Sequence, residues 1–275
     1  MNKLITALAT PYLDGKIDKL SYEKLLQFQL EHGVDALLAV GTTAEAQLLD
    51  DCEKKLLTKL AKGMAGEVPV YVCIEGRSTR DAVRDAEMAQ KCGADGILVA
   101  PPSFCKCTSE GYRLHIEQLL KSVSVPLILY NAPSRCGYTL DKDVVKELSD
   151  KVHFLKDAGS DLNYTESLAE SMTVLCGNDG MLPQFLEKGA TGVISVVSNI
   201  APLLTRQVLD GGDTEIFVKL ADLTMREVSP IPIKYMLYKM GIFRSYEMRL
   251  PLTAANDLTK KAINEFFDEK AEKIR

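Results

Sequence analysis

No block of like charges occurs in this 275-residue chain, and its formal net charge is −5. A protein that binds nucleic acid needs a concentrated basic face, so this composition argues against nucleic acid as a partner. The lysine-rich stretch from Lys260 to Arg275 does not supply such a face, because Glu265, Glu269 and other acids are interspersed in it. We interpret this stretch as a solvated amphipathic helix.

The sequence also lacks any long apolar run and any disulfide pattern. No segment approaches the ~18 apolar residues of a membrane span, and the apolar run near the N-terminus is shorter than the core of a signal peptide. The seven cysteines are an odd number with scattered spacing, and Cys105 and Cys107 are closer than the C-x-x-C spacing. We therefore expect a cytoplasmic protein with no membrane partner, no disulfide framework and no zinc site.

Short apolar runs alternate with longer amphipathic segments along most of the chain. Eight of these runs are apolar on both faces, as the strands of a parallel sheet are. The expected strands are residues 4–9, 36–40, 68–73, 96–100, 127–130, 152–156, 173–176 and 192–196. The expected helices between them include residues 21–32, 52–64, 79–92, 109–121, 140–148 and 182–188.

This alternation predicts an α/β fold, a (β/α)8 TIM barrel. A single barrel of this kind needs about 250 residues, which the chain can supply. An open, doubly wound sheet is the alternative, but the first strand is not followed by the G-x-G-x-x-G that would favour it. We predict that residues 1–228 form the barrel. Residues 229–275 are expected to form a C-terminal helical extension packed on it, with helices at 233–240 and 254–273.

The carboxyl ends of the strands are where such barrels carry their chemistry. Lys156 ends the expected sixth strand, where partial desolvation would favour a neutral amine that can attack a ketone. Tyr130 ends the expected fifth strand, where its phenol could transfer protons. Each residue has an alternative role, because the lysine could extend to solvent at the rim and the tyrosine could pack against a helix.

Two further strand ends carry groups that suit a carboxylate. Thr42 and Thr43 follow a glycine after the second strand and could offer hydroxyl and N–H donors. The alternative is an ordinary turn with one helix N-cap. Arg135, in the loop after the fifth strand, could bind a carboxylate with its fork of N–H groups or simply be solvated. No one of these residues is decisive, but their convergence on one rim indicates an active site.

Three motifs together identify a family. They are Gly41-Thr42-Thr43-Ala44-Glu45, Tyr130-Asn131-Ala132-Pro133-Ser134-Arg135 and Phe154-Leu155-Lys156-Asp157-Ala158. With them the chain resembles the dihydrodipicolinate synthase / N-acetylneuraminate lyase family, and the likeness covers essentially its whole length. The resemblance implies a Schiff-base mechanism that uses no metal and no cofactor. It also implies a homo-oligomer, a homotetramer or homodimer.

The resemblance further implies roles for individual residues. Lys156 would form an imine with pyruvate, and loss of a methyl proton would then give an enamine that attacks an aldehyde. Tyr130 and Thr43 would serve in proton transfer, and the Thr42–Thr43 turn would hold the pyruvate carboxylate. The residues expected to bind substrates are Thr42, Thr43, Arg135, Gly177 and Ile194.

Within the family, Arg135 favours one branch. The pattern Tyr-Asn-x-Pro-x-Arg resembles the synthases, in which this arginine meets the carboxylate of aspartate semialdehyde. The implied reaction condenses pyruvate with L-aspartate semialdehyde to 4-hydroxy-tetrahydrodipicolinate, on the route to diaminopimelate and lysine. The alternatives are an aldolase for a 2-keto-3-deoxy sugar acid or an N-acetylneuraminate-type substrate, a non-catalytic paralogue, or an unrelated barrel enzyme with a phosphate site at residues 177–180.

Two positions depart from the synthase pattern. Phe104 stands where the synthases usually have a tyrosine that reaches a neighbouring subunit's site. A phenyl ring has no hydroxyl, so we expect that step of the proton relay to be lost or replaced by water. Ala44 replaces the glycine usual in the Thr-Thr-Gly-Glu turn. Its methyl group is expected to restrict φ or to narrow the approach to the carboxylate.

Overall fold

Eight parallel strands close into a barrel in the computed structural model, which describes residues 2–270 and 272. Around the ring the strands pair in the order β1 (Lys3–Ala7), β10 (Gly192–Ser195), β9 (Val174–Cys176), β8 (Phe154–Asp157), β7 (Leu127–Asn131), β6 (Gly96–Val99), β5 (Val70–Ile74) and β4 (Ala36–Val40). The pairing of β4 with β1 closes the ring. The predicted (β/α)8 barrel is confirmed, together with all eight expected strands.

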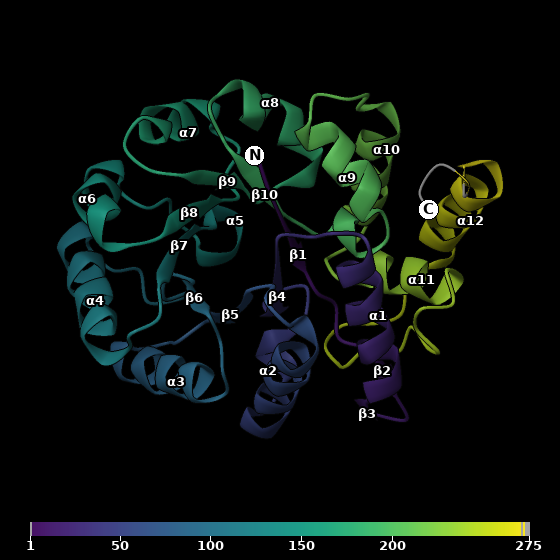
Figure 1. Ribbon diagram of the computed structural model, residues 1–275, viewed down its shortest axis with the longest axis horizontal. Coiled ribbons are helices and arrows are strands. Elements are labelled where there is room, and N and C mark those ends of the chain that lie inside the picture. Colours follow the sequence, from purple (N-terminus) through teal and green to yellow (C-terminus); the bar gives the residue numbers. More distant parts are fainter. Residues whose placement is uncertain (1, 271, 273–275) are drawn as a thin grey trace.

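The helices mostly form a layer outside these strands, although the short α5 (Pro133–Cys136) lies inside that layer near β7 and β8 (Figure 1). They are α1 (Lys19–Glu31), α2 (Asp51–Ala65), α3 (Thr79–Lys91), α4 (Ser109–Ser122), α5 (Pro133–Cys136), α6 (Lys142–Leu148), α7 (Leu162–Ala169), α8 (Leu182–Glu187), α9 (Pro202–Leu209), α10 (Glu215–Thr224), α11 (Ile231–Lys239) and α12 (Asp257–Lys270). The short elements are a hairpin, β2 (Tyr12–Leu13) and β3 (Lys16–Ile17), and the 3-10 turns η1 (Ala46–Leu48), η2 (Ser149–Lys151), η3 (Asp179–Met181) and η4 (Val197–Asn199). The expected barrel helices are confirmed, whereas α5, α7, α9 and α10 are additional to them.

Local sequence explains where the helices begin and end. Helix α2 starts with a capping box, in which the Asp50 carboxylate accepts from the Glu53 N–H and the Glu53 carboxylate accepts from the Asp50 N–H. Gly33, Gly93 and Gly189 follow α1, α3 and α8 with positive φ, as expected for residues that end a helix before a strand. None of the helices among residues 2–270 has the length and apolar character that crossing a membrane requires.

The barrel interior is packed by every second residue of each strand. On β7 these inward residues include Ile128 and Tyr130, and on β8 they include Phe154. Successive side chains of a strand point to opposite faces, so Lys156 shares the inward face of Phe154. A second apolar layer fills the space between the strands and the helices. The last inward-facing side chain of each strand therefore lies at the carboxyl rim of the barrel.

The C-terminal extension packs on one side of the barrel. Helices α11 and α12 pack against α10 and against each other (Figure 1), and α11 also contacts η4. The two expected extension helices are confirmed, although the second starts at Asp257 and residue 273 lies outside the described residues. The division of the chain at residue 228 stays a prediction.

An ion pair ties the extension to α1. Arg244 donates to both carboxylate oxygens of Asp18, at 2.8 and 2.6 Å, and Asp18 is the N-cap of α1. Hydrogen bonds from Arg244, and to a smaller extent from Ser21, lower the pKa of Asp18 to about 2 against the opposing effect of burial. A carboxyl group with a lowered folded-state pKa stabilises the fold above its ordinary pKa of about 4. That contribution is lost as the pH falls toward 2.

We expect the substitution Arg244→Gln to lower the free energy of unfolding at pH 7 by about 1 kcal/mol, a modest value because half of the arginine is exposed. The loss should shrink between about pH 4 and pH 2, where Asp18 becomes protonated in the folded state. Urea unfolding of both proteins at pH 7, 4 and 3 measures this. Arg80→Gln, at an exposed position of α3, is the control. A deficit that stays constant over this range would contradict the assignment.

Candidate active site

A cavity opens at the carboxyl ends of the barrel strands. Its walls come from strand ends, from the loops after β4, β7 and β9, and from the segment that joins α10 to α11. Six of the seven residues predicted for the site line it: Thr42, Thr43, Tyr130, Arg135, Lys156 and Gly177. The structure therefore brings together residues that are scattered over about half of the chain.

Lys156 and Tyr130 lie side by side in this cavity. They occupy paired positions on the neighbouring strands β8 and β7, and each side chain is only 7% exposed. The Lys156 Nζ atom is 4.4 Å from the centroid of the Tyr130 ring. Neither residue has the alternative role considered for it, since the lysine does not extend to solvent and the tyrosine does not pack on an outer helix. The pair instead presents an amine and a phenol to the same space.

Gly177 allows the end of β9 to approach Lys156 closely. A Cβ atom at this position would lie 2.9 Å from the Lys156 Cε atom and 2.8 Å from the Ala158 Cβ atom. Both distances are shorter than carbon atoms tolerate, so any side chain here would displace the lysine or the strand. Gly177 thus lines the cavity next to the Lys156 side chain, and its contact with substrate stays a prediction.

The turn after β4 holds both threonines at the cavity. The Ala44 N–H donates to the Gly41 carbonyl and the Glu45 N–H donates to the Thr42 carbonyl. The Thr10 hydroxyl donates to the Ala44 carbonyl at 2.8 Å. Ala44 does not have a positive φ, whereas Glu45 does, at 58°. The methyl group of Ala44 therefore causes no backbone strain, because the left-handed residue of this turn is the next one, and a narrowed approach to the carboxylate stays a prediction.

Arg135 reaches the cavity from the short helix α5, which begins directly after β7. The segment is held by Asn131, whose Oδ1 atom accepts from the Leu140 N–H and whose amide donates to the Asp157 carboxylate at 2.9 Å. Asp157 faces away from the cavity and is fully buried. The arginine side chain itself is exposed, so its guanidinium group is free to meet an anionic substrate at the mouth.

Ile194 lies elsewhere. It belongs to the apolar cluster inside the barrel, with Tyr130 and Phe154, and it is not among the residues that line the cavity. Its expected contact with substrate stays a prediction. Within the part of the chain that the structure describes, no group of three or more His, Cys, Asp or Glu side chains is arranged to hold a metal ion.

Asp179 lines the cavity, although the sequence marked it only as part of the segment 177–180. Its Oδ2 atom accepts from the N–H groups of Val196 and Val197, at 2.7 and 3.1 Å. Burial raises the pKa of Asp179, while its hydrogen bonds and the Lys156 charge oppose the rise. The segment 177–180 had been considered as a phosphate site, but a buried carboxylate does not suit a phosphate there. What distinguishes Asp179 from an ordinary turn residue is its burial, which the sequence does not reveal.

Three further wall residues come from the end of α10 and the segment after it. They are Thr224, Met225 and Ser229. No strand-end signal precedes them, so sequence reasoning about barrel rims could not find them. Their presence means that the start of the extension closes one side of the site.

Fold and cavity together define an enzyme of the (β/α)8 class, with a buried amine, a phenol and a hydroxyl-bearing turn at the rim. The sequence profile of the dihydrodipicolinate synthetase family matches residues 1–270. A 4-hydroxy-tetrahydrodipicolinate synthase of Rickettsia bellii is 34% identical over 98% of both chains. One of Alkaliphilus oremlandii is 34% identical over 94% of both.

Solved structures agree with these relatives. The chloride-inhibited dihydrodipicolinate synthase of Acinetobacter baumannii, complexed with pyruvate, is 31% identical, with a TM-score of 0.93 over 98% of this chain and 99% of that one. The 4-hydroxy-tetrahydrodipicolinate synthase of Methylacidiphilum fumariolicum is 30% identical, with a TM-score of 0.92 over 99% of this chain and 97% of that one. The chain belongs to the dihydrodipicolinate synthetase family. It is an enzyme, a lyase, and the alternatives of a non-catalytic paralogue and an unrelated barrel enzyme are set aside.

Proposed function

We propose that this lyase condenses pyruvate with L-aspartate semialdehyde to give 4-hydroxy-tetrahydrodipicolinate, the precursor of diaminopimelate and lysine. The observation that carries the proposal is the Lys156 amine beside the Tyr130 ring, 4.4 Å from its centroid, in one cavity with the Thr42–Thr43 turn and Arg135. The relatives named 4-hydroxy-tetrahydrodipicolinate synthase support the same reaction.

The proposed chemistry starts at Lys156. Its neutral amine attacks the ketone carbon of pyruvate, water leaves, and an imine forms. Loss of a proton from the methyl group gives an enamine, whose carbon attacks the aldehyde to form the new carbon–carbon bond. The amine of the second substrate then attacks the imine carbon, which closes the ring and releases Lys156. Tyr130 and Thr43 carry the protons for these steps, because both residues bear a hydroxyl group and line the same cavity as Lys156.

Two groups recognise the two carboxylates in this proposal. Hydroxyl and N–H donors of the Thr42–Thr43 turn hold the carboxylate of pyruvate, which places its ketone at the lysine. The guanidinium of Arg135 forms a charge-assisted pair with the carboxylate of aspartate semialdehyde at the mouth. One anchor for each substrate fixes their relative orientation.

The direct test is turnover of pyruvate plus L-aspartate semialdehyde, coupled to an excess of the NADPH-dependent reductase that follows in the pathway. The loss of NADPH absorbance reports product, and we expect robust turnover. Folded protein that leaves this pair of substrates unchanged, but cleaves a 2-keto-3-deoxy sugar acid or N-acetylneuraminate, would overturn the proposal.

Arg135 provides a test of the aldehyde site. We expect Arg135→Ala to raise the KM for aspartate semialdehyde roughly 10- to 100-fold, because a hydrogen-bonded charge pair is lost. The KM for pyruvate should stay unchanged, since its anchor is the turn. Steady-state kinetics with each substrate varied in turn separates the two effects, and Arg80→Ala on the exposed face of α3 is the control. Equal increases in both KM values would argue against this role.

The proposal includes a cytoplasmic homo-oligomer, a tetramer or dimer, that works without a cofactor. Phe104 lies in the loop after β6 with φ of 71° and a fully exposed ring. An exposed aromatic ring in a strained loop suits contact with a neighbouring subunit. One solved relative, 30% identical, is described as the first monomeric dihydrodipicolinate synthase variant, which supports oligomers as the usual state of such relatives.

A further inference from the structure

Five side chains behind the Thr42–Thr43 turn form what we call the buried charge cluster. Its members are Tyr12, Glu45, Glu53, Lys234 and Arg249. Both carboxylates belong to the barrel, in the turn and in α2, whereas both cations belong to the extension. Lys234 Nζ and Arg249 Cζ lie 4.2 and 4.3 Å from the centroid of the Tyr12 ring, so one aromatic ring contacts both cations. The cluster joins the extension to the turn that borders the cavity.

Lys234 makes the most deeply buried ion pair of the described residues. Its Nζ atom is 2.7 Å from the Glu45 Oε1 atom, and neither side chain has any exposed surface. The other Glu45 oxygen has no hydrogen-bond partner within the described residues. Burial raises the pKa of Glu45, with the Lys234 charge opposing the rise. Burial also lowers the pKa of Lys234 to about 8, with Glu45 opposing the fall.

A buried ion pair of this kind need not contribute to the stability of the fold. Burial acts against the charged form of both partners, and a buried ion pair can often be replaced by apolar side chains without loss of stability. The pair does fix the position of the Glu45 side chain. This residue has a left-handed backbone, φ 58°, that a side chain rarely adopts without support from its surroundings.

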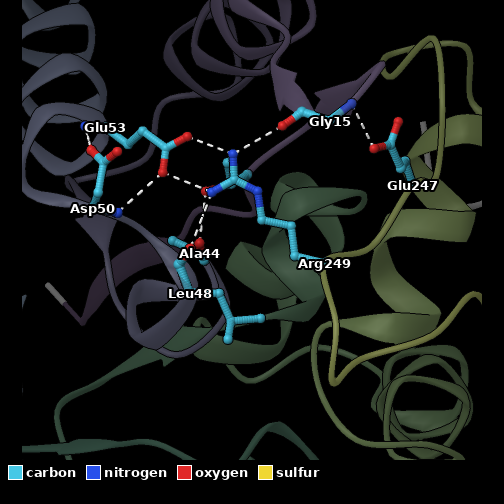
Figure 2. Close-up of polar contacts among 8 residues, drawn as sticks. Gly15, Ala44, Leu48, Asp50, Glu53, Glu247 and Arg249 are labelled. Carbon is cyan, nitrogen blue, oxygen red and sulfur yellow. Dashed lines mark hydrogen bonds and ion pairs between the residues drawn. The ribbon is translucent and has the colours of Figure 1, made fainter.

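Arg249 restrains the residues that follow Glu45 in the chain (Figure 2). Its guanidinium group forms a two-pronged pair with Glu53, in which Nη1 is 2.7 Å from Oε2. It also donates to the carbonyl of Leu48, which ends η1, and to the carbonyl of Gly15 in the hairpin, both at 3.1 Å. Glu53 in turn caps α2 with Asp50. Arg249 thus connects the end of the turn, the start of α2 and the β2–β3 hairpin.

The turn is therefore restrained from its far side at successive points. Thr10 holds the carbonyl of Ala44, Lys234 holds the side chain of Glu45, and Arg249 holds the carbonyl of Leu48. The Glu45 N–H donates to the carbonyl of Thr42 at 3.0 Å, so a displacement of Glu45 passes directly to the threonines. Neither cation lines the cavity.

We propose that Lys234 and Arg249 are positioning residues for the 2-oxo acid carboxylate, which they orient through Glu45 and the Thr42–Thr43 turn without touching substrate. The inference rests on the proposed function, because it concerns the pyruvate half of that site. It makes the extension part of the catalytic apparatus. Loss of the contacts of Lys234 or Arg249 should weaken the binding of pyruvate but not that of the aldehyde. Lys156, Tyr130 and Arg135 are held by other elements, β8, β7 and α5.

The test uses variants that separate an effect on the stability of the fold from an effect on the binding of pyruvate. The double variant Glu45→Met, Lys234→Met replaces the buried pair by apolar chains of similar length, so it should fold with little loss of stability. Arg244→Gln is the matched control: it removes another cation of the extension, one that pairs with Asp18 on α1 and not with the turn. Arg249→Met is a second test, which leaves the Lys234–Glu45 pair intact and removes only the contacts of Arg249.

The readouts are the pyruvate concentration that half-saturates borohydride trapping at Lys156, the KM for each substrate, and the urea-unfolding curve. We expect the double variant and Arg249→Met each to raise the half-saturating pyruvate concentration about tenfold or more, as a small misplacement of a binding group does. The KM for the aldehyde and the trapped fraction at saturating pyruvate should change less than about twofold. Arg244→Gln should lower stability and leave pyruvate saturation unchanged.

Two failures can be told apart. If the wild-type protein forms no reducible pyruvate adduct, the proposed function fails and the inference falls with it. If the wild-type protein forms the adduct and the folded double variant saturates at the same pyruvate concentration, the inference alone is wrong. If the double variant does not fold, Arg249→Met decides by the same criterion.

Discussion

Replacing Lys156 by alanine is expected to reduce turnover at least about 10³-fold, because removal of a covalent nucleophile leaves only substrate binding and the remaining polar groups. Treatment of the wild-type protein with pyruvate and borohydride should attach a reduced three-carbon acid to Lys156, and the variant should take up none. Peptide mass spectrometry identifies the modified residue. Lys156→Arg keeps the positive charge but cannot form an imine, so it should be equally inactive.

Lys146→Ala, at an exposed position on α6, is the matched control and should retain both turnover and the adduct. An adduct found on a different lysine, or turnover that survives in Lys156→Ala, would refute the assignment of Lys156 as the reacting amine.

Replacing Tyr130 by phenylalanine is expected to lower kcat by about 10²- to 10⁴-fold, the range that a positioned proton-transfer group supplies. The substitution keeps the ring beside the Lys156 amine and the packing against the barrel interior, so only the hydroxyl is removed. The KM for pyruvate should change little. The loss should be concentrated in the rate of imine formation, which rapid-quench borohydride trapping measures.

Tyr112→Phe is the control for this experiment. Tyr112 is a buried tyrosine of α4 whose hydroxyl has no hydrogen-bond partner within the described residues, so its removal should leave both stability and kcat unchanged. If Tyr130→Phe formed the imine at the wild-type rate, another group would have to transfer the protons.

The sequence predicted the barrel well because the signals it uses are local. Strands buried on both faces and helices with one apolar face differ in period, and glycines such as Gly93 end helices at fixed distances from the next strand. The same local signals placed Lys156 at the rim of the barrel, whereas its role as an imine-forming amine came from the resemblance to the family. Helices α7 and α9 were not among the helices named from the sequence, although the shorter α6 and α8 were.

Other parts of the site depend on contacts between distant segments. Glu45 and Lys234 are 189 residues apart, and Glu53 and Arg249 are 196 residues apart. No pattern within a window of ten or twenty residues connects such pairs. The left-handed backbone of Glu45 has a related origin, because the side chain that pairs with this residue, Lys234, is far away along the chain and no local pattern marks it.

By itself the sequence determined the class of fold, the order of the strands along the chain and the residues that stand at their carboxyl ends, because all three follow from local hydrophobic periodicity. Only the tertiary structure decided that Asp179 is buried beside the amine, that Ile194 lies inside the barrel, and that the extension holds the Thr42–Thr43 turn. Burial and charge pairing are properties of the space between elements, and that space exists only once the ring has closed.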